Sequence, residues 1–244
     1  MKIDILTLFP EMFTAVTEAS MLGRAAEKGL LDITLTDIRD YTQDRHNRVD
    51  ECPFGGGAGM VMMPDPAFRA LSSVGAENKH VIYMSPRGPV LDQKKIEELS
   101  GEAELVILCG HYEGIDERII EKWDMEEISI GDYILTGGEP AAIVLIDAVA
   151  RMIPGVLGDS ASVMEESIYS GLLEYPQYTR PREYEDMAVP EVLFSGDHEK
   201  VRLWKFEKSL ELTKKRRPDL FRKFLEEAEG LTAAEKKILE KLCT

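Results

Sequence analysis

The chain has 244 residues, of which 44% are hydrophobic and 30% are charged, a composition typical of globular proteins with a substantial core. Its net charge of −16 argues against nonspecific binding to nucleic acid. The longest apolar run, Ala141 to Ile146, is far shorter than the roughly 20 residues of a membrane span, so we expect no membrane association. The N-terminus lacks a signal-peptide pattern, and three cysteines without close pairs predict a reducing, cytoplasmic environment.

Short apolar segments alternate with amphipathic ones as far as Ile153. The segments rich in Ile, Leu and Val are predicted strands: Ile3–Phe9, Leu31–Ile38, His80–Ser85, Glu104–Gly110 and Glu126–Gly131. The segments with helical periodicity are predicted helices: Glu11–Lys28, Asp65–Val74, Asp92–Leu99, Gly114–Trp123 and Glu139–Ile153. This alternation predicts an α/β fold in which helices cover both faces of a mostly parallel sheet.

The sequence changes character after Ile153. Residues 159–182 show no clear period and contain several glycines and prolines, which is typical of a long loop or linker. From His198 onward helical patterns dominate, and Thr232 to Glu235 matches a capping box. We therefore predict a first domain over residues 1–160, a linker over 161–180 and a small helical domain over 181–244.

Charge is distributed unevenly between these parts. Residues 181–244 carry 14 basic and 14 acidic side chains, whereas residues 1–180 carry 15 basic and 31 acidic ones. The C-terminal part also contains the basic run KKRRP at Lys214–Pro218. A polyanionic partner would meet less repulsion there. On charge alone, a solvated helix face is the simpler interpretation of this run.

Loops rich in glycine or proline follow the last three predicted strands of the sheet. They are YMSPRGPVLD from Tyr83, LCGHYEGIDERI from Leu108 and ISIGDYILTGGEP from Ile128. Ligands of parallel α/β sheets bind beyond the carboxyl ends of strands, so these loops together predict a ligand site. The last loop lacks the GxGxxG and GxxxxGK[ST] patterns and contains no Lys or Arg. It would supply backbone groups and apolar walls rather than positive charge. His111 is either structural or part of this site.

Two further stretches each allow a functional and a purely structural interpretation. The glycine run Gly55–Gly59 can cradle a planar or anionic group on its amides, or form a flexible surface loop. The linker contains Glu165 and Glu166 together with tyrosines and Arg180. Carboxylates can act as general bases, and Tyr and Arg can stack on nucleobases. A solvated acidic loop is the alternative.

Several strings occur in a familiar order: GGGAGM, YMSPRG, LCGHYEGIDERI, ISIGDYILTGGEPAAIVLIDAVARMIPGVLG, SGLLEYPQYTRP and VPEVLFSGDH. Together they resemble the bacterial tRNA (guanine-N1)-methyltransferase family of the SPOUT class, which methylates the guanine at position 37, next to the anticodon. The resemblance covers nearly the whole chain, from DILTLFPEMF to KRRPDLF. It implies a homodimer with the active site at the dimer interface. It also implies a deep trefoil knot, which is rare among protein folds.

The resemblance implies that S-adenosyl-L-methionine binds in the knot loops. The implied cofactor-binding residues are Tyr83, Ser85, Pro86, Gly110, Tyr112, Glu113, Ile130, Gly131, Asp132, Tyr133, Ile134, Leu135, Gly137 and Gly138. The implied substrate-binding residues are Gly55, Gly56, Gly57, Ala58, Gly59 and Arg180. The glycine run would receive the target guanine. A cationic sulfonium cofactor fits a loop without Lys or Arg.

The reaction itself requires two catalytic groups. N1 of neutral guanine carries a proton, which a base must remove as the methyl carbon approaches. Negative charge then grows toward O6, where a fixed cation would stabilise it. The resemblance assigns Arg151 to O6 and Glu166 to the base. The family usually has Asp before Ser-Phe at the latter position, whereas here Glu166 precedes Ser167-Ile168, so Glu165 is the alternative base.

The resemblance also implies partners. The linker would become ordered when tRNA binds, with the base supplied across the dimer. The C-terminal helices would hold a tRNA that has guanine at position 37, and a divalent cation, magnesium, would assist catalysis, although the sequence shows no metal-ligand pattern. Two alternatives stay open: a related knotted methyltransferase that acts on another RNA position, and a catalytically silent RNA-binding module.

Overall fold

The computed structural model describes residues 1–157 and 171–243. The chain forms two compact units, Met1–Gly158 and Asp159–Thr244. No helix within the described ranges combines the length and apolar character needed to cross a membrane.

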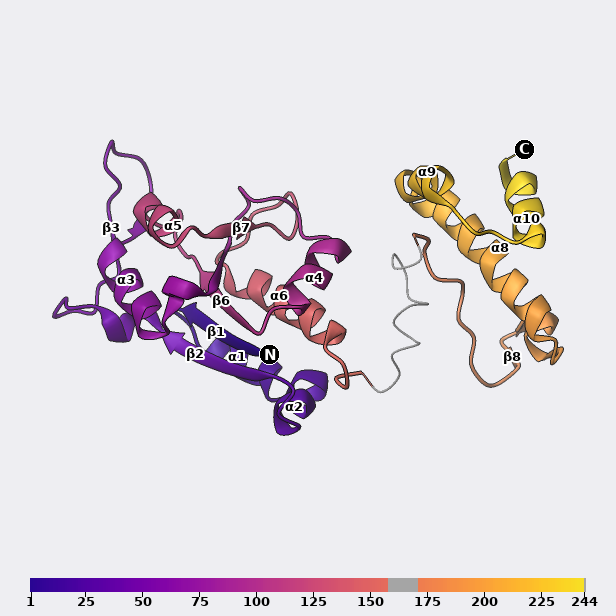
Figure 1. Ribbon diagram of the computed structural model, residues 1–244, viewed down its shortest axis with the longest axis horizontal. Coiled ribbons are helices and arrows are strands. Elements are labelled where there is room, and N and C mark those ends of the chain that lie inside the picture. The colour runs from indigo at the N-terminus through magenta and orange to yellow at the C-terminus, as the bar shows by residue number, and fades with distance from the viewer. Residues whose placement is uncertain (158–170, 244) are drawn as a thin grey trace. The chain divides into compact units, whose positions relative to one another are not determined.

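The first unit is built on a five-stranded sheet with strand order β2-β1-β6-β5-β7, drawn in Figure 1. The strands are β1 (Lys2–Thr7), β2 (Asp32–Asp37), β5 (His80–Met84), β6 (Glu104–Cys109) and β7 (Glu126–Ile128). Every neighbouring pair is parallel. The predicted α/β class with a mostly parallel sheet is therefore confirmed, and the carboxyl ends of β5, β6 and β7 lie next to one another.

Side chains alternate between two hydrophobic cores along each central strand, because successive residues of a strand point to opposite faces. On β6, Leu105 and Ile107 belong to one core, and Val106 and Leu108 belong to the other. The register aligns Ile107 with Ile5 of β1 and with Ile82 of β5, which continues the first core across the sheet. Strands buried on both faces explain why these segments are almost uniformly apolar.

Helices contribute to each core. Buried residues of the first core come from α1 (Glu11–Thr17), α2 (Ser20–Glu27), α4 (Gln93–Ser100) and α6 (Glu139–Met152). The second core receives side chains from α3 (Pro64–Ser73) and α5 (Glu117–Trp123). The sheet is thus covered on both faces, as the sequence predicts. The short elements are β3 (Asp50–Glu51), β4 (Val61–Met62), η1 (Ile38–Tyr41) and η2 (Ala76–Asn78).

Two predicted helices differ from the structure. The single helix expected over Glu11–Lys28 is wrong, because the chain is extended at Ala19 (φ −111°, ψ 162°) and then left-handed at Ser20 (φ 53°). These conformations separate α1 from α2. The helix expected from Gly114 begins only at Glu117, because the Asp116 side chain accepts a hydrogen bond from Arg118 N and caps it there.

The second unit contains α8 (His198–Arg216), α9 (Pro218–Glu227), α10 (Ala233–Cys243) and the short η3 (Glu191–Phe194). The helices pack around a small core that includes Leu172, Leu210 and Phe221. The helical pattern predicted from His198 is confirmed. The capping box is confirmed as well, since Thr232 N donates to Glu235 Oε2 (2.8 Å) and Glu235 N donates to Thr232 Oγ1 (3.3 Å).

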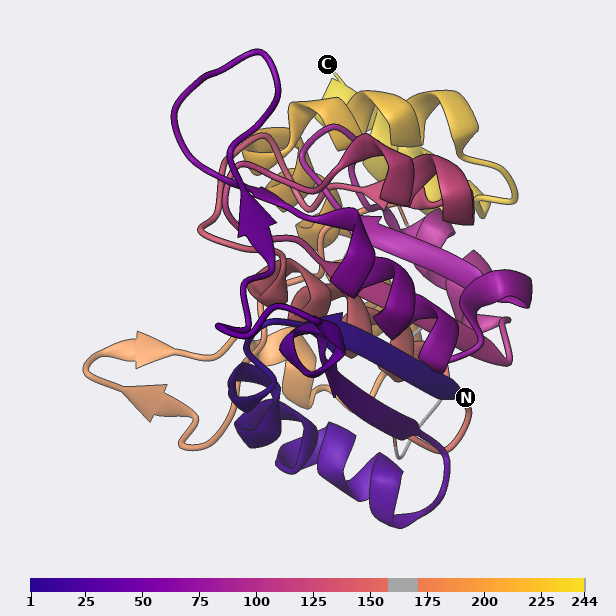
Figure 2. The same cartoon turned by 90° about the vertical axis from the view of Figure 1, so that its left-hand side faces the viewer.

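A hairpin of β8 (Glu183–Tyr184) and β9 (Met187–Ala188) precedes these helices. The sequence analysis did not predict it. Its turn residues Glu185 and Asp186 have φ of 49° and 62°, a conformation for which Asn and Gly are the usual signals. Figure 2 shows the hairpin as the pair of orange arrows joined by a turn. The side chains of Tyr184 and Met187 are exposed.

Candidate functional site

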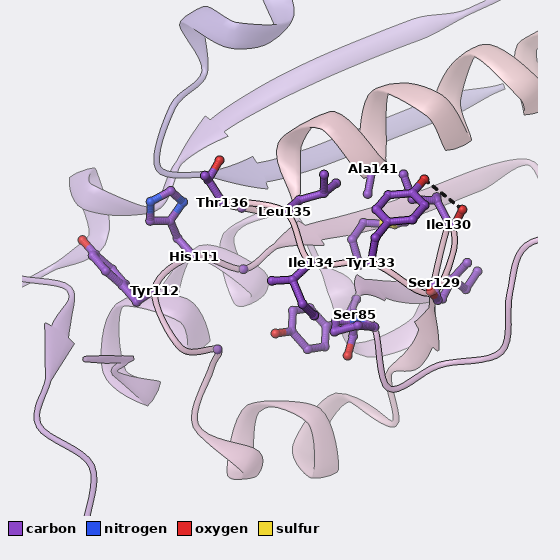
Figure 3. Close-up of a pocket in the computed structure, with 18 of the residues that line it drawn as sticks. Ser85, His111, Tyr112, Ser129, Ile130, Tyr133, Ile134, Leu135, Thr136 and Ala141 are labelled. Atoms are coloured by element: carbon purple, nitrogen blue, oxygen red, sulfur yellow. Dashed lines mark hydrogen bonds between the residues drawn. The ribbon is translucent and has the colours of Figure 1, made fainter. Parts of the chain in front are cut away.

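A cavity of ≈ 350 Å³ lies at the carboxyl ends of β5, β6 and β7. Figure 3 shows the loops that form it: the turn after β5 with Ser85, the segment with His111 and Tyr112 after β6, and the long loop from Ser129 to Thr136. The start of α6, with Ala141, completes the wall. The structure therefore brings together the three loops that the sequence singled out.

Every predicted cofactor-binding residue except Asp132 lines this cavity. Those that line it are Tyr83, Ser85, Pro86, Gly110, Tyr112, Glu113, Ile130, Gly131, Tyr133, Ile134, Leu135, Gly137 and Gly138. The wall also contains His111, for which the sequence left a site role open, and residues without a predicted role: Met84, Gly114, Ile128, Ser129, Thr136 and Ala141. Most of these additional residues are adjacent in sequence to predicted ones. Their position at the ends of strands was the one sequence signal that could have indicated them.

Glycine is required where the cavity loops meet. A β-carbon on Gly138 would lie 3.0 Å from Cys109 Cα and 3.0 Å from Gly110 N, a distance that forces the neighbouring backbone to move. Gly138 N donates a hydrogen bond to Gly110 O (2.8 Å). The start of α6 thus lies directly on the main chain that follows β6.

The loop after β7 is held by its own polar groups. Ser129 Oγ accepts a hydrogen bond from Gly131 N (3.1 Å), and the Tyr133 hydroxyl donates to Ile130 O (3.2 Å), the latter drawn as a dashed line in Figure 3. The side chains that follow are unusually exposed for apolar residues: 54% for Tyr133 and 80% for Ile134. Such a cluster is typical of a surface that a ligand or partner covers.

The cavity offers little positive charge. Among the described residues that line it there is no Lys or Arg, and Glu113 is the one acidic side chain. Burial raises the pKa of Tyr83 to about 12, so its phenol is neutral at physiological pH. Arg87 follows β5 but donates to Glu117 Oε2 (2.9 Å) and Glu127 Oε1 (2.7 Å). The guanidinium therefore braces the loop, and the cavity suits a neutral or cationic ligand.

The glycine run forms an exposed loop between β3 and β4 that projects from the sheet, at the upper left of Figure 1. Gly55, Gly56, Gly57 and Gly59 have φ of 88°, 78°, 126° and 84°, which explains why glycine occupies these positions. A β-carbon on Gly59 would lie 2.3 Å from Glu113 Cγ, and Glu113 N donates to Met60 O (3.0 Å). One end of the loop therefore touches the cavity wall.

Arg151, one of the two predicted catalytic residues, is not part of this wall. Arg151 lies in the last turn of α6, whereas Ala141 near its start lines the cavity. Ten residues of α-helix at 1.5 Å each separate them by about 15 Å. Glu166 and its alternative, Glu165, lie outside the described residues.

Arg180 lies in the second unit, where it lines a separate hollow of ≈ 450 Å³ with Tyr178 and Tyr184. The described residues contain no group of three or more His, Cys, Asp and Glu side chains that could hold a metal ion.

The fold and the cavity define an α/β protein with a small-molecule-sized cavity, lined by main-chain and apolar groups, at the carboxyl edge of a parallel sheet. A sequence model of the family described as tRNA (Guanine-1)-methyltransferase TrmD matches residues 1–223. This chain belongs to that tRNA (guanine-N1)-methyltransferase family, as its motifs indicated.

Curated relatives agree with this assignment. The chain is 54% identical over 241 residues to the tRNA (guanine-N(1)-)-methyltransferase of Clostridium botulinum, with 98% of each chain covered. It is 53% identical over 240 residues to that of Clostridium acetobutylicum, covering 98% of this chain and 96% of the relative. It is 55% identical over 226 residues to that of Ruminiclostridium cellulolyticum, covering 91% and 97%.

Proposed function

We propose that this protein transfers a methyl group from S-adenosyl-L-methionine to N1 of the guanine at position 37 of tRNA, on the 3′ side of the anticodon. The cavity beyond β5, β6 and β7 carries the proposal, because it gathers nearly every residue that the family motifs assign to the cofactor. Its volume of ≈ 350 Å³ falls within the usual range of small-molecule sites.

The residues of the cavity fit S-adenosyl-L-methionine. Ile130, Leu135 and Ala141 offer apolar surface for a planar base. The lining glycines, such as Gly131 and Gly137, put no side chain between the main chain and the polar edges of that base. When bound, this cofactor supplies an electrophilic methyl group on a positively charged sulfur. The lack of Lys and Arg among the described lining residues avoids repulsion of that charge.

Two side chains of this chain would act on the guanine. Glu166 would accept the N1 proton, because a carboxylate is a competent general base once it lies within hydrogen-bond reach. Arg151 would donate to O6 and stabilise the charge that develops there. The glycine loop Gly55–Gly59, which touches Glu113 at one end, would receive the base after it leaves its stack.

A homodimer supplies the missing geometry. Arg151 lies about 15 Å along α6 from the cavity of its own chain, so the Arg151 that serves a cavity would come from the second copy. Glu166 would come from the second copy as well. The exposed side chains of Tyr133 and Ile134 at the mouth of the cavity are apolar surface that a partner subunit can cover.

The second unit would hold the tRNA. Its basic run, Lys214–Arg217, is exposed at the junction of α8 and α9. The Trp204 ring lies 6.5 Å from Tyr175 and 6.3 Å from Tyr178, and Lys205 Nζ lies 4.4 Å from the Tyr175 ring. Aromatic rings next to cations are a common RNA-contacting surface. Arg180 would add a phosphate or base contact.

We also infer the trefoil knot, a cytoplasmic location and assistance by magnesium from the family. The close contacts of the cavity loops support the knot. Ser129 N donates to Pro89 O (3.0 Å), Leu91 N donates to Ser129 O (2.8 Å), and Gly138 N donates to Gly110 O.

A methylation assay in which the modified nucleotide is mapped tests the proposed function. Purified protein, S-adenosyl-L-methionine with a labelled methyl group, and a tRNA with guanine at positions 36 and 37 should yield label on N1 of guanine 37. A matched tRNA with adenine at position 37 is the control. Label at another position would identify a related methyltransferase, and cofactor binding without any label would reject the reaction.

A further inference from the structure

His111 and Glu139 form a polar pair at the edge of the cavity. His111 follows β6 and lines the cavity, whereas Glu139 begins α6 and is only 1% exposed. His111 Nδ1 lies 3.9 Å from Glu139 Oε2. A β-carbon on Gly137 would lie 2.6 Å from Nδ1 and 2.4 Å from Oε2, so the glycine leaves the space in which these two side chains meet.

The Glu139 carboxylate is held firmly in place. Its Oε1 accepts a hydrogen bond from Thr7 Oγ1 at the end of β1 (2.8 Å). Thr7 Oγ1 in turn accepts from Phe9 N (2.9 Å). Glu139 also occupies the first turn of α6, where the helix dipole favours negative charge. This leaves Oε2 as the oxygen that faces the imidazole.

The His111 ring has a buried nitrogen, Nδ1. Nδ1 is inaccessible and makes no hydrogen bond with any residue in the described part of the chain, although the side chain as a whole is 24% exposed. Buried nitrogens without a partner are rare. The ring packs against Phe9 and Tyr112, with centroids 4.9 Å and 5.0 Å away. The accessible part of the ring therefore does not include Nδ1.

The chemistry of the pair determines which nitrogen carries the proton. An ionised carboxylate can only accept, so Nδ1 must donate if the two groups bond. Their separation exceeds an ordinary N–H···O hydrogen bond by about 1 Å, and such bonds in active sites often shorten when the ligand binds. A neutral imidazole protonated on Nδ1 has a free acceptor at Nε2.

We propose that Glu139 fixes the Nδ1–H tautomer of His111, so that His111 Nε2 accepts a hydrogen bond from an N–H group of a ligand in the cavity. The inference rests on the proposed function, in which both ligands carry such groups: the amino groups of the methyl donor and the N–H edge of guanine. Figure 3 shows His111 beside Tyr112 and Thr136, on the opposite side of the pocket from Tyr133. Glu139 is a positioning residue, and His111 is a ligand-contact residue.

Nitrogen NMR tests the tautomer without any activity measurement. The chain has four histidines, and the spectrum of a His111→Asn variant identifies the signals of His111. We expect the Nδ1–H tautomer in the full-length wild-type protein and a shift toward Nε2–H in Glu139→Gln. Glu126→Gln is the matched control, since Glu126 pairs with His80 (2.9 Å) outside the cavity. A wild-type Nε2–H tautomer, or a tautomer unchanged in Glu139→Gln, would overturn the proposal.

Two substitutions of His111 test the acceptor. Asparagine places an amide near Nδ1 but does not reach Nε2, whereas glutamine reaches the Nε2 position. Loss of one hydrogen bond predicts about a tenfold effect for His111→Asn and a smaller one for His111→Gln, with His80→Asn as control. Calorimetry with S-adenosyl-L-homocysteine and measurement of kcat/KM for tRNA then show which ligand His111 contacts. Loss of a cofactor contact would raise the Kd for S-adenosyl-L-homocysteine, whereas loss of a guanine contact would lower kcat/KM for tRNA alone.

Either of these patterns supports the acceptor role. Equal losses in His111→Asn and His111→Gln would indicate packing of the ring, and wild-type values for His111→Asn in both assays would indicate no contact. Both outcomes overturn the proposal. Failure of the wild-type protein to methylate guanine 37 would instead reject the proposed function, while the NMR experiment would still report on the pair.

Discussion

Gly110 lies so close to Tyr83 that a β-carbon on Gly110 would sit 2.7 Å from Cε2 of the ring and 2.8 Å from its hydroxyl oxygen. This contact joins the end of β6 to the end of β5 at the cavity wall. Because Tyr83 is 7% exposed and packed in the second core, its ring has little room to retreat.

Gly110→Ala should therefore distort the cavity. We expect unfolding to become easier by about 1–3 kcal/mol, the usual cost of overpacking, and the affinity for S-adenosyl-L-methionine to fall at least about tenfold. Urea denaturation and calorimetry measure the two effects. Gly101→Ala, outside the cavity, is the matched control, because its β-carbon would make a single milder contact, 3.3 Å from Glu98 O. Wild-type affinity in Gly110→Ala would show that the contact does not shape the site.

Glu166→Gln should separate chemistry from binding. Removal of the proposed general base should lower kcat by about 100- to 10,000-fold, while the Kd for the cofactor changes little because the cavity residues are untouched. Single-turnover methylation and calorimetry provide the measurements, with Glu165→Gln as the comparison. Near-normal turnover in Glu166→Gln, together with a loss in Glu165→Gln, would transfer the role to Glu165.

Mixed dimers of the proposed homodimer should reveal which copy supplies Arg151. Arg151→Met removes the cation, and Leu135→Arg fills the cavity of its own chain, so each homodimer should be inactive. If Arg151 serves the cavity of the partner, a heterodimer of the two variants retains one complete site. Random exchange in an isologous dimer would then restore about a quarter of wild-type activity. No recovery, despite heterodimers detected by mass spectrometry, would place Arg151 in its own site.

The raised pKa of Tyr83 predicts a specific loss of stability in alkali. Burial favours the neutral phenol and raises its pKa from 10.0 to about 12. The stabilisation is present in full below about pH 10 and is lost as the pH rises toward 12, amounting to about 2–3 kcal/mol. Tyr83→Phe lacks this ionisation, so the difference between wild type and variant in unfolding free energy should change only over that interval. Parallel curves above pH 10 would contradict the assignment.

The exposed basic run predicts a salt-dependent contact with tRNA. Lys215→Ala and Arg216→Ala should each weaken tRNA binding and reduce the slope of log K against log salt by about one. Filter binding across a salt series measures this slope. Lys94→Ala removes an exposed charge from α4 in the first unit and is the matched control. An equal effect of all three substitutions would indicate a response to net charge alone.

The sheet and most of the cavity could be predicted because their signals are local. Apolar strands such as Glu104–Cys109 end at a glycine, and parallel strands bring these ends together. Other features depend on contacts that no local pattern reveals. Thr7 and Glu139 form a hydrogen bond although 132 positions separate them in the sequence. The left-handed Ser20, which separates α1 from α2, occupies a segment whose periodicity fits one helix.

The prevalence of backbone in the cavity wall has a consequence for inhibition. An inhibitor that bonds to main-chain groups of the cavity wall would rely on atoms that every amino acid possesses. Substitutions at Gly110 and Gly138 would disturb the enzyme's own cofactor as much as the drug, because an added β-carbon collides with Tyr83 or with the main chain at Cys109. Resistance would have to arise at side chains of the rim such as Ile134, which is 80% exposed.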